Sequence, residues 1–259
     1  MAERAPKLAE IQPSKAKNEL AAEFSFAAHL DASAAQLTGR KGEKTKARLI
    51  ASTGRLLEDS GLHGLTHNHV CDAAGINVST FYQYFPNKTE IVSHVIDLFL
   101  QFIIRLRVDR WAAGQQQAKE TDDPYGVIYL SNLQVLNVAS ANPGLYRCVL
   151  QIGAERTVVA KRWQRLSAEY ALRSARRVQR AVPNQSIEDL NLKATLLGGM
   201  VDDFCRNYFV FEDDAFRQPW IDKFATMTDL AVFLTDIWYQ TMMNLEPPKD
   251  KERWLAVFD

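Results

Sequence analysis

Apolar residues recur along this chain at the three- and four-residue spacing of amphipathic α-helices. Such runs occupy residues 49–57 and 91–106, and similar runs return nearer the carboxyl end at residues 197–208 and 220–238. The two-residue alternation that marks a half-buried strand does not stand out in any part of the sequence. The pattern therefore predicts an all-α protein.

Residues that start and stop helices divide this pattern into separate elements. Asn87 can cap the helix that follows it, with Glu90 three residues later in a capping-box arrangement. Pro124 suits the first turn of another helix, and residues 142–144 form a loop between helices. The helix after Asn87 is expected to run to about residue 111.

The segment from residue 61 to residue 88 carries the most informative spacing. Thr66 can cap a short helix that Gly75 ends with a positive φ, and Asn77 can cap a second short helix. Two short helices joined by a glycine-containing turn are typical of the helix-turn-helix motif. The inward positions are apolar, as packing requires: Val70, Ala74, Ile76, Phe81 and Phe85.

Charge is distributed unevenly around this motif, although the chain as a whole is neutral, with 31 basic and 31 acidic residues. Residues 40–48 hold five cations and one anion, Glu43, which leaves a local net charge of +4. The cations are Arg40, Lys41, Lys44, Lys46 and Arg48. Such a cluster can hold phosphates, and helix amino termini offer further N–H groups to them. The motif therefore indicates an interface for double-stranded DNA.

The stretch from about Lys44 to Ile91 resembles the DNA-binding domain of the tetracycline-repressor (TetR) family. The positions that match the family's pattern without a gap are Thr66, Val70, Ala74, Gly75, Ile76, Thr80, Phe81, Tyr82, Tyr84, Phe85 and Lys88. The resemblance covers under a fifth of the chain. It departs from the family's usual residues at Cys71, Asn77, Val78 and Ser79.

The resemblance implies DNA contacts for a set of residues at the motif: Thr66, His67, Val78, Ser79, Thr80, Tyr82, Tyr84 and Lys88. Val78, Ser79 and Thr80 would enter the major groove, the two tyrosines would contact the DNA backbone, and Lys88 would neutralise a phosphate. Val78 cannot donate a hydrogen bond to guanine. We therefore expect it to contact a thymine methyl group, and a good base contact is worth about 1–3 kcal/mol.

The resemblance also implies a cavity in the larger helical domain that accepts a small molecule of apolar or aromatic character. The residues considered for its wall are Phe102, Trp163, Phe204 and Tyr208. Aromatic residues at helical spacing nevertheless belong more often to a packed core than to a pocket. In the implied mechanism the ligand shifts the helix that begins at Lys88 and weakens operator binding, and repression is the family's usual mode.

Dimer formation is expected from the last two predicted helices, at about residues 187–211 and 219–243. Both have apolar residues on more than one side, so one side can face the core and another a second copy in a four-helix bundle. The glycines at residues 198–199 fit close helix approach either there or inside one subunit. A homodimer would place two recognition helices about 34 Å apart on a palindromic operator.

The chain is expected to divide into four segments. The first forty residues are rich in Ala, Lys and Glu and would bury little apolar surface, so we expect a flexible arm over residues 1–39. A helix-turn-helix domain at residues 40–87, an effector-binding and dimerisation domain at residues 88–245 and a tail at residues 246–259 follow. Three widely spaced cysteines and the lack of an apolar leader favour the cytoplasm, and the resemblance implies a bacterial protein.

Two other sites were weighed against this interpretation. Three histidines and a cysteine within residues 63–71 could bind a metal, but the helix-turn-helix register already explains each of them, so no metal is expected. The basic stretch at residues 155–180 could be a second nucleic-acid surface. A solvated helix face explains its charge pattern better.

Enzymatic function has little support in the sequence. Gly-rich phosphate loops, a nucleophile elbow, HExxH and paired Cys-x-x-Cys are missing, so we expect no enzyme and no cofactor. A helical small-molecule carrier or an enzyme that has lost operator binding is the alternative. No membrane partner is expected, since the most apolar stretch, residues 91–108, contains several charged and polar residues.

Overall fold

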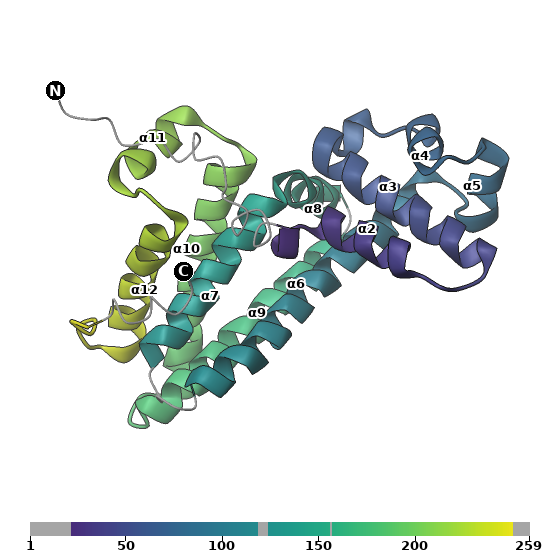
Figure 1. Cartoon of the computed structure of the whole chain (residues 1–259). Helices are drawn as coiled ribbons and strands as arrows, with labels where there is room; N and C mark the ends of the chain where they lie inside the picture. The colour runs from purple at the N-terminus through teal and green to yellow at the C-terminus, as the bar shows by residue number, and fades with distance from the viewer. Residues whose placement is uncertain (1–21, 119–123, 156, 251–259) are drawn as a thin grey trace. The chain divides into compact units, whose positions relative to one another are not determined.

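The computed structural model describes residues 22–118, 124–155 and 157–250, and this part of the chain is helical with no strand. The predicted all-α fold is confirmed (Figure 1). The helices are α2 (Phe26–Gln36), α3 (Lys41–Gly64), α4 (His67–Ala74), α5 (Val78–Tyr84), α6 (Lys88–Ala118), α7 (Pro124–Ala141), α8 (Pro143–Glu155), α9 (Thr157–Ala181), α10 (Ile187–Cys205), α11 (Asp214–Lys223) and α12 (Met227–Met243). A short π-helix, η1 (Arg206–Val210), continues α10. None of the helices in these ranges combines the length and apolar character that crossing a bilayer requires.

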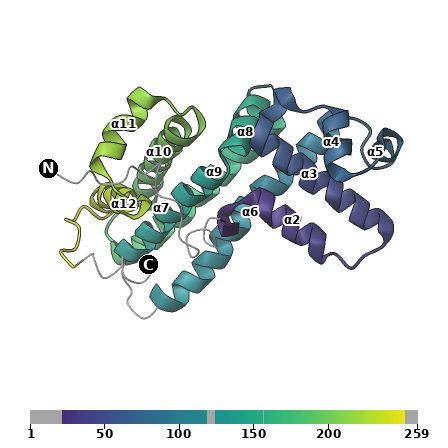
Figure 2. The ribbon, with the colours of Figure 1, turned by 45° about the horizontal axis from the view of Figure 1, so that its top comes forward.

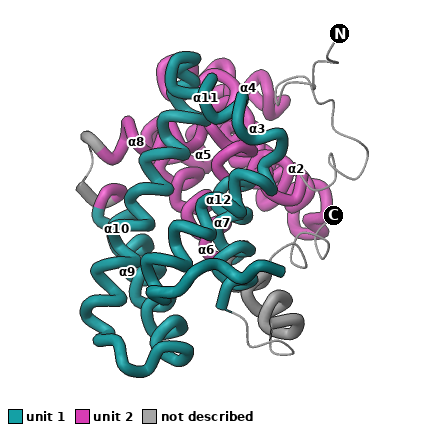
Figure 3. Tube along the Cα trace, turned by 90° about the vertical axis from the view of Figure 1, so that its left-hand side faces the viewer, with its two compact units in different colours: residues 1–12, 105–137, 161–259 teal, residues 13–104, 138–160 magenta. Residues whose placement is uncertain are grey.

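The helices belong to two compact units, which are coloured separately in Figure 3. Unit 2 falls within residues 13–104 and 138–160, and unit 1 falls within residues 105–137 and 161–259. Helices α6, α7 and α9 each contain residues of both units. The segment expected to form a helix-turn-helix domain, residues 40–87, therefore shares its unit with α2, the first part of α6 and the whole of α8.

The core of unit 2 is built from α3, α6 and α8. Leu49 and Leu57 of α3, Ile96 and Phe99 of α6 and Leu145 of α8 are fully buried. Burial of each such side chain stabilises the fold by about 1.5–3 kcal/mol. Helix α2 lies along α3 in the views of Figures 1 and 2.

Helix α2 corrects the expectation of a flexible arm over residues 1–39, because residues 26–36 are helical. Phe24 and Phe26 are each 1% exposed. Residues 1–21 lie outside the described part of the chain. The prediction was wrong because a few large side chains anchor this helix, and neither average composition nor weak amphipathicity reveals them.

The core of unit 1 gathers α9, α10 and α12. Its buried residues are Ala171, Ala175, Val178, Leu190, Ala194, Leu197, Trp238, Met242 and Met243. Helix α7 joins this core through two polar contacts with α12. Asn132 Nδ2 donates to Thr235 Oγ1 at 3.2 Å, and the Tyr125 hydroxyl donates to Asp236 Oδ1 at 2.7 Å. These bonds hold the register between α7 and α12.

The helix predicted over residues 219–243 is two helices, since α11 ends at Lys223 and α12 begins at Met227. Thr226 explains the break. Its Oγ1 accepts the Asp229 N–H at 3.1 Å, and the Asp229 carboxylate accepts the Thr226 N–H at 2.9 Å, which is a capping box. The sequence pattern missed it because the apolar residues on either side keep helical spacing across the break.

Candidate functional site

The short helices α4 and α5 form where the cap residues predicted them. Thr66 Oγ1 accepts the His69 N–H at 3.2 Å, and Gly75 ends α4 with φ 63° and ψ 43°. Asn77 Oδ1 accepts the Thr80 N–H at 2.8 Å at the start of α5. The predicted helix-turn-helix is confirmed. Helices α3, α4 and α5 are called the head below.

The solvent side of α5 is the candidate recognition surface. Phe81 is fully buried and anchors the helix, whereas Ser79 is exposed. Val78 is 39% exposed and Tyr82 is 50% exposed. The helix therefore presents a methyl-bearing side chain, a hydroxyl and a phenol to the surroundings.

Two hydroxyl groups at the start of α5 are oriented by a single acceptor. The hydroxyls of Ser79 and Thr80 both donate to Asn77 Oδ1, at 2.8 Å and 2.7 Å. A hydroxyl has one donor and two acceptor lone pairs, so both oxygens can still accept hydrogen bonds. The amino groups of adenine and cytosine are the donors in the major groove. The tip of α5 thus offers acceptors that suit these two bases.

His67 and Lys88, both expected to contact DNA, also hold the head together. The His67 ring lies edge-on to the Phe81 ring, with the centroids 5.3 Å apart. Lys88 Nζ donates to the carbonyl oxygen of Leu65 at 2.9 Å, which ties α6 to the end of α3. An ammonium group has three donors, so Lys88 can hold this carbonyl and contact a phosphate together.

The basic segment predicted at residues 40–48 lies at the start of α3, and its five cations are exposed. Its anion, Glu43, is used within the segment, where a carboxylate oxygen accepts the Arg40 N–H at 2.7 Å. The Tyr84 hydroxyl lies beside Gly42, since a Cβ built on Gly42 would be 3.3 Å from it. The cations therefore lie close to the end of α5.

Comparison with known families agrees with this geometry. Residues 49–95 match the family described as bacterial regulatory proteins, tetR family. This segment of the chain therefore carries the sequence pattern of the TetR family's DNA-binding domain. The matched range begins in α3, ends in α6 and contains both helices of the motif, which confirms the resemblance predicted over Lys44–Ile91.

Two solved structures of RolR are similar to this chain. RolR in complex with its ligand resorcinol is 22% identical, covers 75% of this chain and 94% of its own, and superposes with a TM-score of 0.44. RolR without ligand is 22% identical, covers 73% of this chain and 95% of its own, with a TM-score of 0.42. A search of curated proteins gave no match.

A small cavity lies between α7, α9 and α12 of unit 1. It has room for about 30 Å³, which is space for about two water molecules. Hydrogen-bonding side chains on its wall are Ser131, Asn132, Tyr170, Ser174, Arg177 and Trp238. An organic ligand would have to push these side chains apart, because the space in this conformation is too small for an aromatic ring.

Trp238 gives this cavity a buried hydrogen-bond donor without an acceptor. The residue is 4% exposed, and its Nε1 is buried with no hydrogen-bond partner within the described structure. A buried N–H without a partner costs about 1–3 kcal/mol. An acceptor oxygen or nitrogen placed beside Nε1 would remove that cost.

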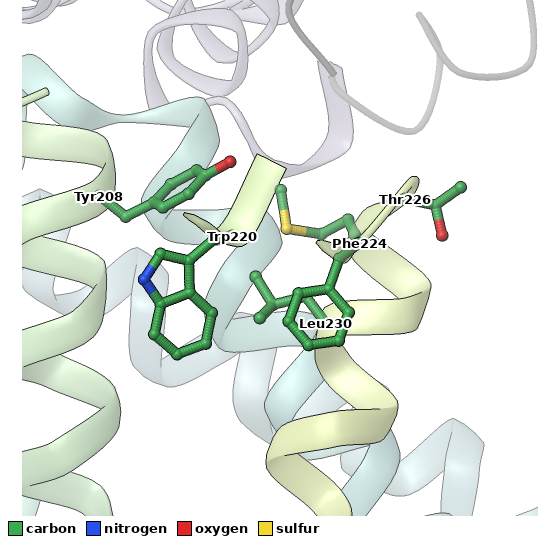
Figure 4. Close-up of a pocket in the computed structure, with 6 residues that line it drawn as sticks. Tyr208, Trp220, Phe224, Thr226 and Leu230 are labelled. Atoms are coloured by element: carbon green, nitrogen blue, oxygen red, sulfur yellow. The ribbon is translucent and has the colours of Figure 1, made fainter. Parts of the chain in front are cut away.

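A second and smaller cavity, of about 10 Å³, lies between η1, α11 and α12. The aromatic rings of Tyr208, Trp220 and Phe224 surround it (Figure 4). Burial raises the pKa of the Tyr208 hydroxyl, and the Arg217 guanidinium, 5.3 Å from the centre of the same ring, opposes that rise. This cavity is almost wholly apolar and holds about one water molecule.

The residues considered for an effector pocket occupy different surroundings. Tyr208 lines the second cavity, and Phe204 stacks on it with ring centroids 5.2 Å apart. Phe102 is buried in unit 2, 5.4 Å from the Phe26 ring. Trp163 is half-buried on α9, away from the walls of both cavities described above. Trp238 could not be found as a cavity residue from the sequence, because its helical spacing is that of any core residue.

The two other sites weighed from the sequence have ordinary surroundings. In the described ranges, no group of three His, Cys, Asp or Glu side chains is placed to hold a metal ion. Cys71 is buried, and burial raises the pKa of its thiol. On α9, Arg165 and Arg173 both pair with Glu169, at 3.0 Å and 3.2 Å, which is the pairing of a solvated helix face.

Proposed function

We propose that the protein is a repressor that binds a palindromic DNA operator as a homodimer and leaves it when a small molecule binds. The exposed tip of α5 carries this proposal, because Val78 and Ser79 face solvent at the start of this helix, and the exposed cations of residues 40–48 lie close to its other end. Base contacts from the tip would supply sequence specificity. Phosphate contacts from the cations would supply most of the affinity and fix the position of the head.

Around the tip, we propose further DNA contacts for the residues that the resemblance implies. Thr66 is exposed at the start of α4 and would touch the groove edge with His67. Tyr82 and Tyr84 would contact the DNA backbone, and Lys88 would add a phosphate contact to its hydrogen bond with α3.

An apolar stripe on α10 supports the homodimer. Leu192, Leu196 and Met200 follow one another at four-residue spacing, and the first two are 63% and 76% exposed. A face of this kind is costly in water and can be covered by the same face of a second copy across a two-fold axis. Gly199 lies on the same side with open space around it, so a partner helix can approach closely.

The cavity between α7, α9 and α12 supports the response to a small molecule. Its unpartnered Trp238 donor and its polar wall would select a compact ligand with at least one acceptor. Widening this cavity would move α7, and α6, whose carboxyl-terminal part belongs to the same unit, is joined through the chain to α5. A ligand must prefer the released state by about 5.5 kcal/mol to change a bound population from 99:1 to 1:99.

Selection of bound duplexes from a random pool tests the operator. We expect a palindrome with half-site centres about one helical turn apart, and an affinity that falls steeply with salt. Full-length protein that binds no duplex at low salt would refute the proposal. Ligand binding in that case would favour the carrier.

A release assay on the selected operator tests the effector. Compounds are added to the preformed complex, and the panel consists of small phenols, aromatic acids and apolar analogues without an acceptor; resorcinol, the ligand in the RolR structure, is one member. We expect release by acceptor-bearing compounds alone. Release by the apolar analogues with equal potency would contradict the assignment of the cavity.

A further inference from the structure

The amino-terminal helix α2 is held by a buried side chain from a distant part of the sequence. Asn142, between α7 and α8, is fully buried. Its Oδ1 accepts the Phe26 N–H at 2.8 Å, and its Nδ2 donates to the carbonyl oxygens of Phe24 and Val138, each at 2.8 Å. A single carboxamide thus joins the start of α2 to the last turn of α7.

Side-chain packing fastens α2 to the head as well. A Cβ built on Gly54, in the middle of α3, would lie 2.6 Å from a terminal methyl carbon of Leu30, so glycine lets the two helices approach closely here. The Phe26 ring lies 5.4 Å from both Phe99 and Phe102, between ring centroids. Helix α2 therefore closes an aromatic part of the core that would otherwise face water.

The corner between α7 and α8 is also hydrogen-bonded to α3 directly. The Glu58 carboxylate accepts the N–H groups of Gly144 and Leu145, at 2.9 Å and 3.0 Å, in the first turn of α8. These two residues follow Asn142 almost at once in the sequence. The corner therefore fastens α3 through Glu58 and α2 through Asn142.

We propose that α2 is a strap that fixes the orientation of the head, and that operator affinity depends on the strap being closed. The contacts named above lie within unit 2. Helix α2 precedes residues 49–95, the range that matches the family, so the family match assigns it no role. The inference rests on the proposed operator binding.

Operator affinity would depend on the strap because a loosely held head loses orientational freedom when it binds DNA. A homodimer meets two half-sites together, so both heads must take up one orientation, and ordering a mobile head costs conformational entropy. A closed strap removes that freedom before binding. Thermodynamic reciprocity then requires that operator binding favours the closed strap by the same factor.

Two substitutions in the full-length protein open the strap from opposite ends. Asn142→Ala removes the clamp and Phe26→Ala removes the aromatic anchor, while Ser33→Ala alters an exposed residue of the same helix and is the matched control. We expect the first two to weaken binding to the selected operator by about tenfold, within the usual range of coupling between sites. Ser33→Ala should leave affinity unchanged. Each affinity is measured well below the unfolding midpoint of that variant.

Hydrogen exchange of the wild-type protein gives a second measurement, which needs no variant to fold. The backbone amides of α2 should exchange more slowly when the operator is bound than when a scrambled duplex is present. Unchanged exchange in α2, or full operator affinity in both folded variants, would overturn the strap. A wild-type protein that binds no duplex would overturn the proposed function instead, so the two failures are distinct.

Discussion

Gly144 of α8 lies directly against the backbone of Glu58 in α3, although 86 residues separate them in the sequence. A Cβ built on Gly144 would lie 2.0 Å from the Glu58 carbonyl oxygen and 2.7 Å from its Cα. The Glu58 side chain turns back and accepts the Gly144 N–H. The spacing between α3 and α8 is therefore set by the absence of a side chain at residue 144.

Gly144→Ala should destabilise the protein by about 1–3 kcal/mol or more, because the clash is with backbone that cannot rotate away. Gly153→Ala, in the same helix, is the matched control. A Cβ there meets no atom within 4 Å, so alanine should be neutral or should stabilise the helix by up to about 1 kcal/mol. Urea unfolding of the two variants gives both values, and equal effects would contradict the contact.

Glu58 should make the stability of the protein depend on pH. Burial raises the pKa of its carboxyl, and hydrogen bonds from the backbone N–H groups of Gly144 and Leu145 oppose the rise. An acid with a higher pKa in the folded state binds its proton more tightly there. Its contribution to stability is then present at low pH and is lost as the pH rises through the raised pKa.

The unfolding free energy of the wild type, relative to that of Glu58→Gln, should therefore fall as the pH rises above about 4, where an unperturbed glutamate titrates. The amide variant cannot titrate, so the difference isolates Glu58. Denaturant unfolding at several pH values measures it. A difference that stays constant or rises with pH would show that burial does not determine the direction of the pKa shift of the Glu58 carboxyl.

Val78 and Lys44 should affect operator binding in different ways. Val78→Ala should reduce the preference for thymine at one position of each half-site, by a part of the roughly 1–3 kcal/mol of a base contact, with the salt dependence unchanged. Lys44→Ala should weaken binding to all duplexes by the same factor. It should also reduce the slope of log affinity against log salt concentration by about one for each subunit. Binding to single-base variants of the operator at several salt concentrations separates the two. A uniform loss for Val78→Ala would rule out its place in the groove.

Trp238→Phe tests the buried donor in the cavity between α7, α9 and α12. The substitution removes the N–H but also part of a buried ring, so it should lower the free energy of unfolding through the space left behind. The same variant should lose affinity for acceptor-bearing effectors and keep its affinity for the operator. Trp220→Phe, at the second cavity, is the control. Unchanged affinity for acceptor-bearing effectors would show that Nε1 does not meet the ligand.

The parts of the fold that local chemistry determines could be predicted from the sequence. Thr66, Gly75 and Asn77 act on backbone groups within three residues of themselves, so their caps and the turn between them follow from residue type and spacing alone. The exposed side of α5 follows in turn from which positions are apolar. The family match covers this same local unit.

The remaining features depend on contacts between residues far apart in the sequence. Nothing near Phe26 indicates that its N–H will meet Asn142, which lies 116 residues away. The sequence does not predict the unpaired donor of Trp238 either, because the helical spacing of this residue is that of an ordinary core residue. Such contacts arise only when distant helices pack.

The contacts of α2 determine which segments an excised DNA-binding module of this protein must include. An excised module that spans only the family-matched residues 49–95 would lack Phe26 and Asn142, and the α3 surface beneath Leu30 would be uncovered. Such a fragment should aggregate. Hybrid proteins that take this helix-turn-helix would need to include α2 and the α7–α8 corner, since these parts belong to one compact unit.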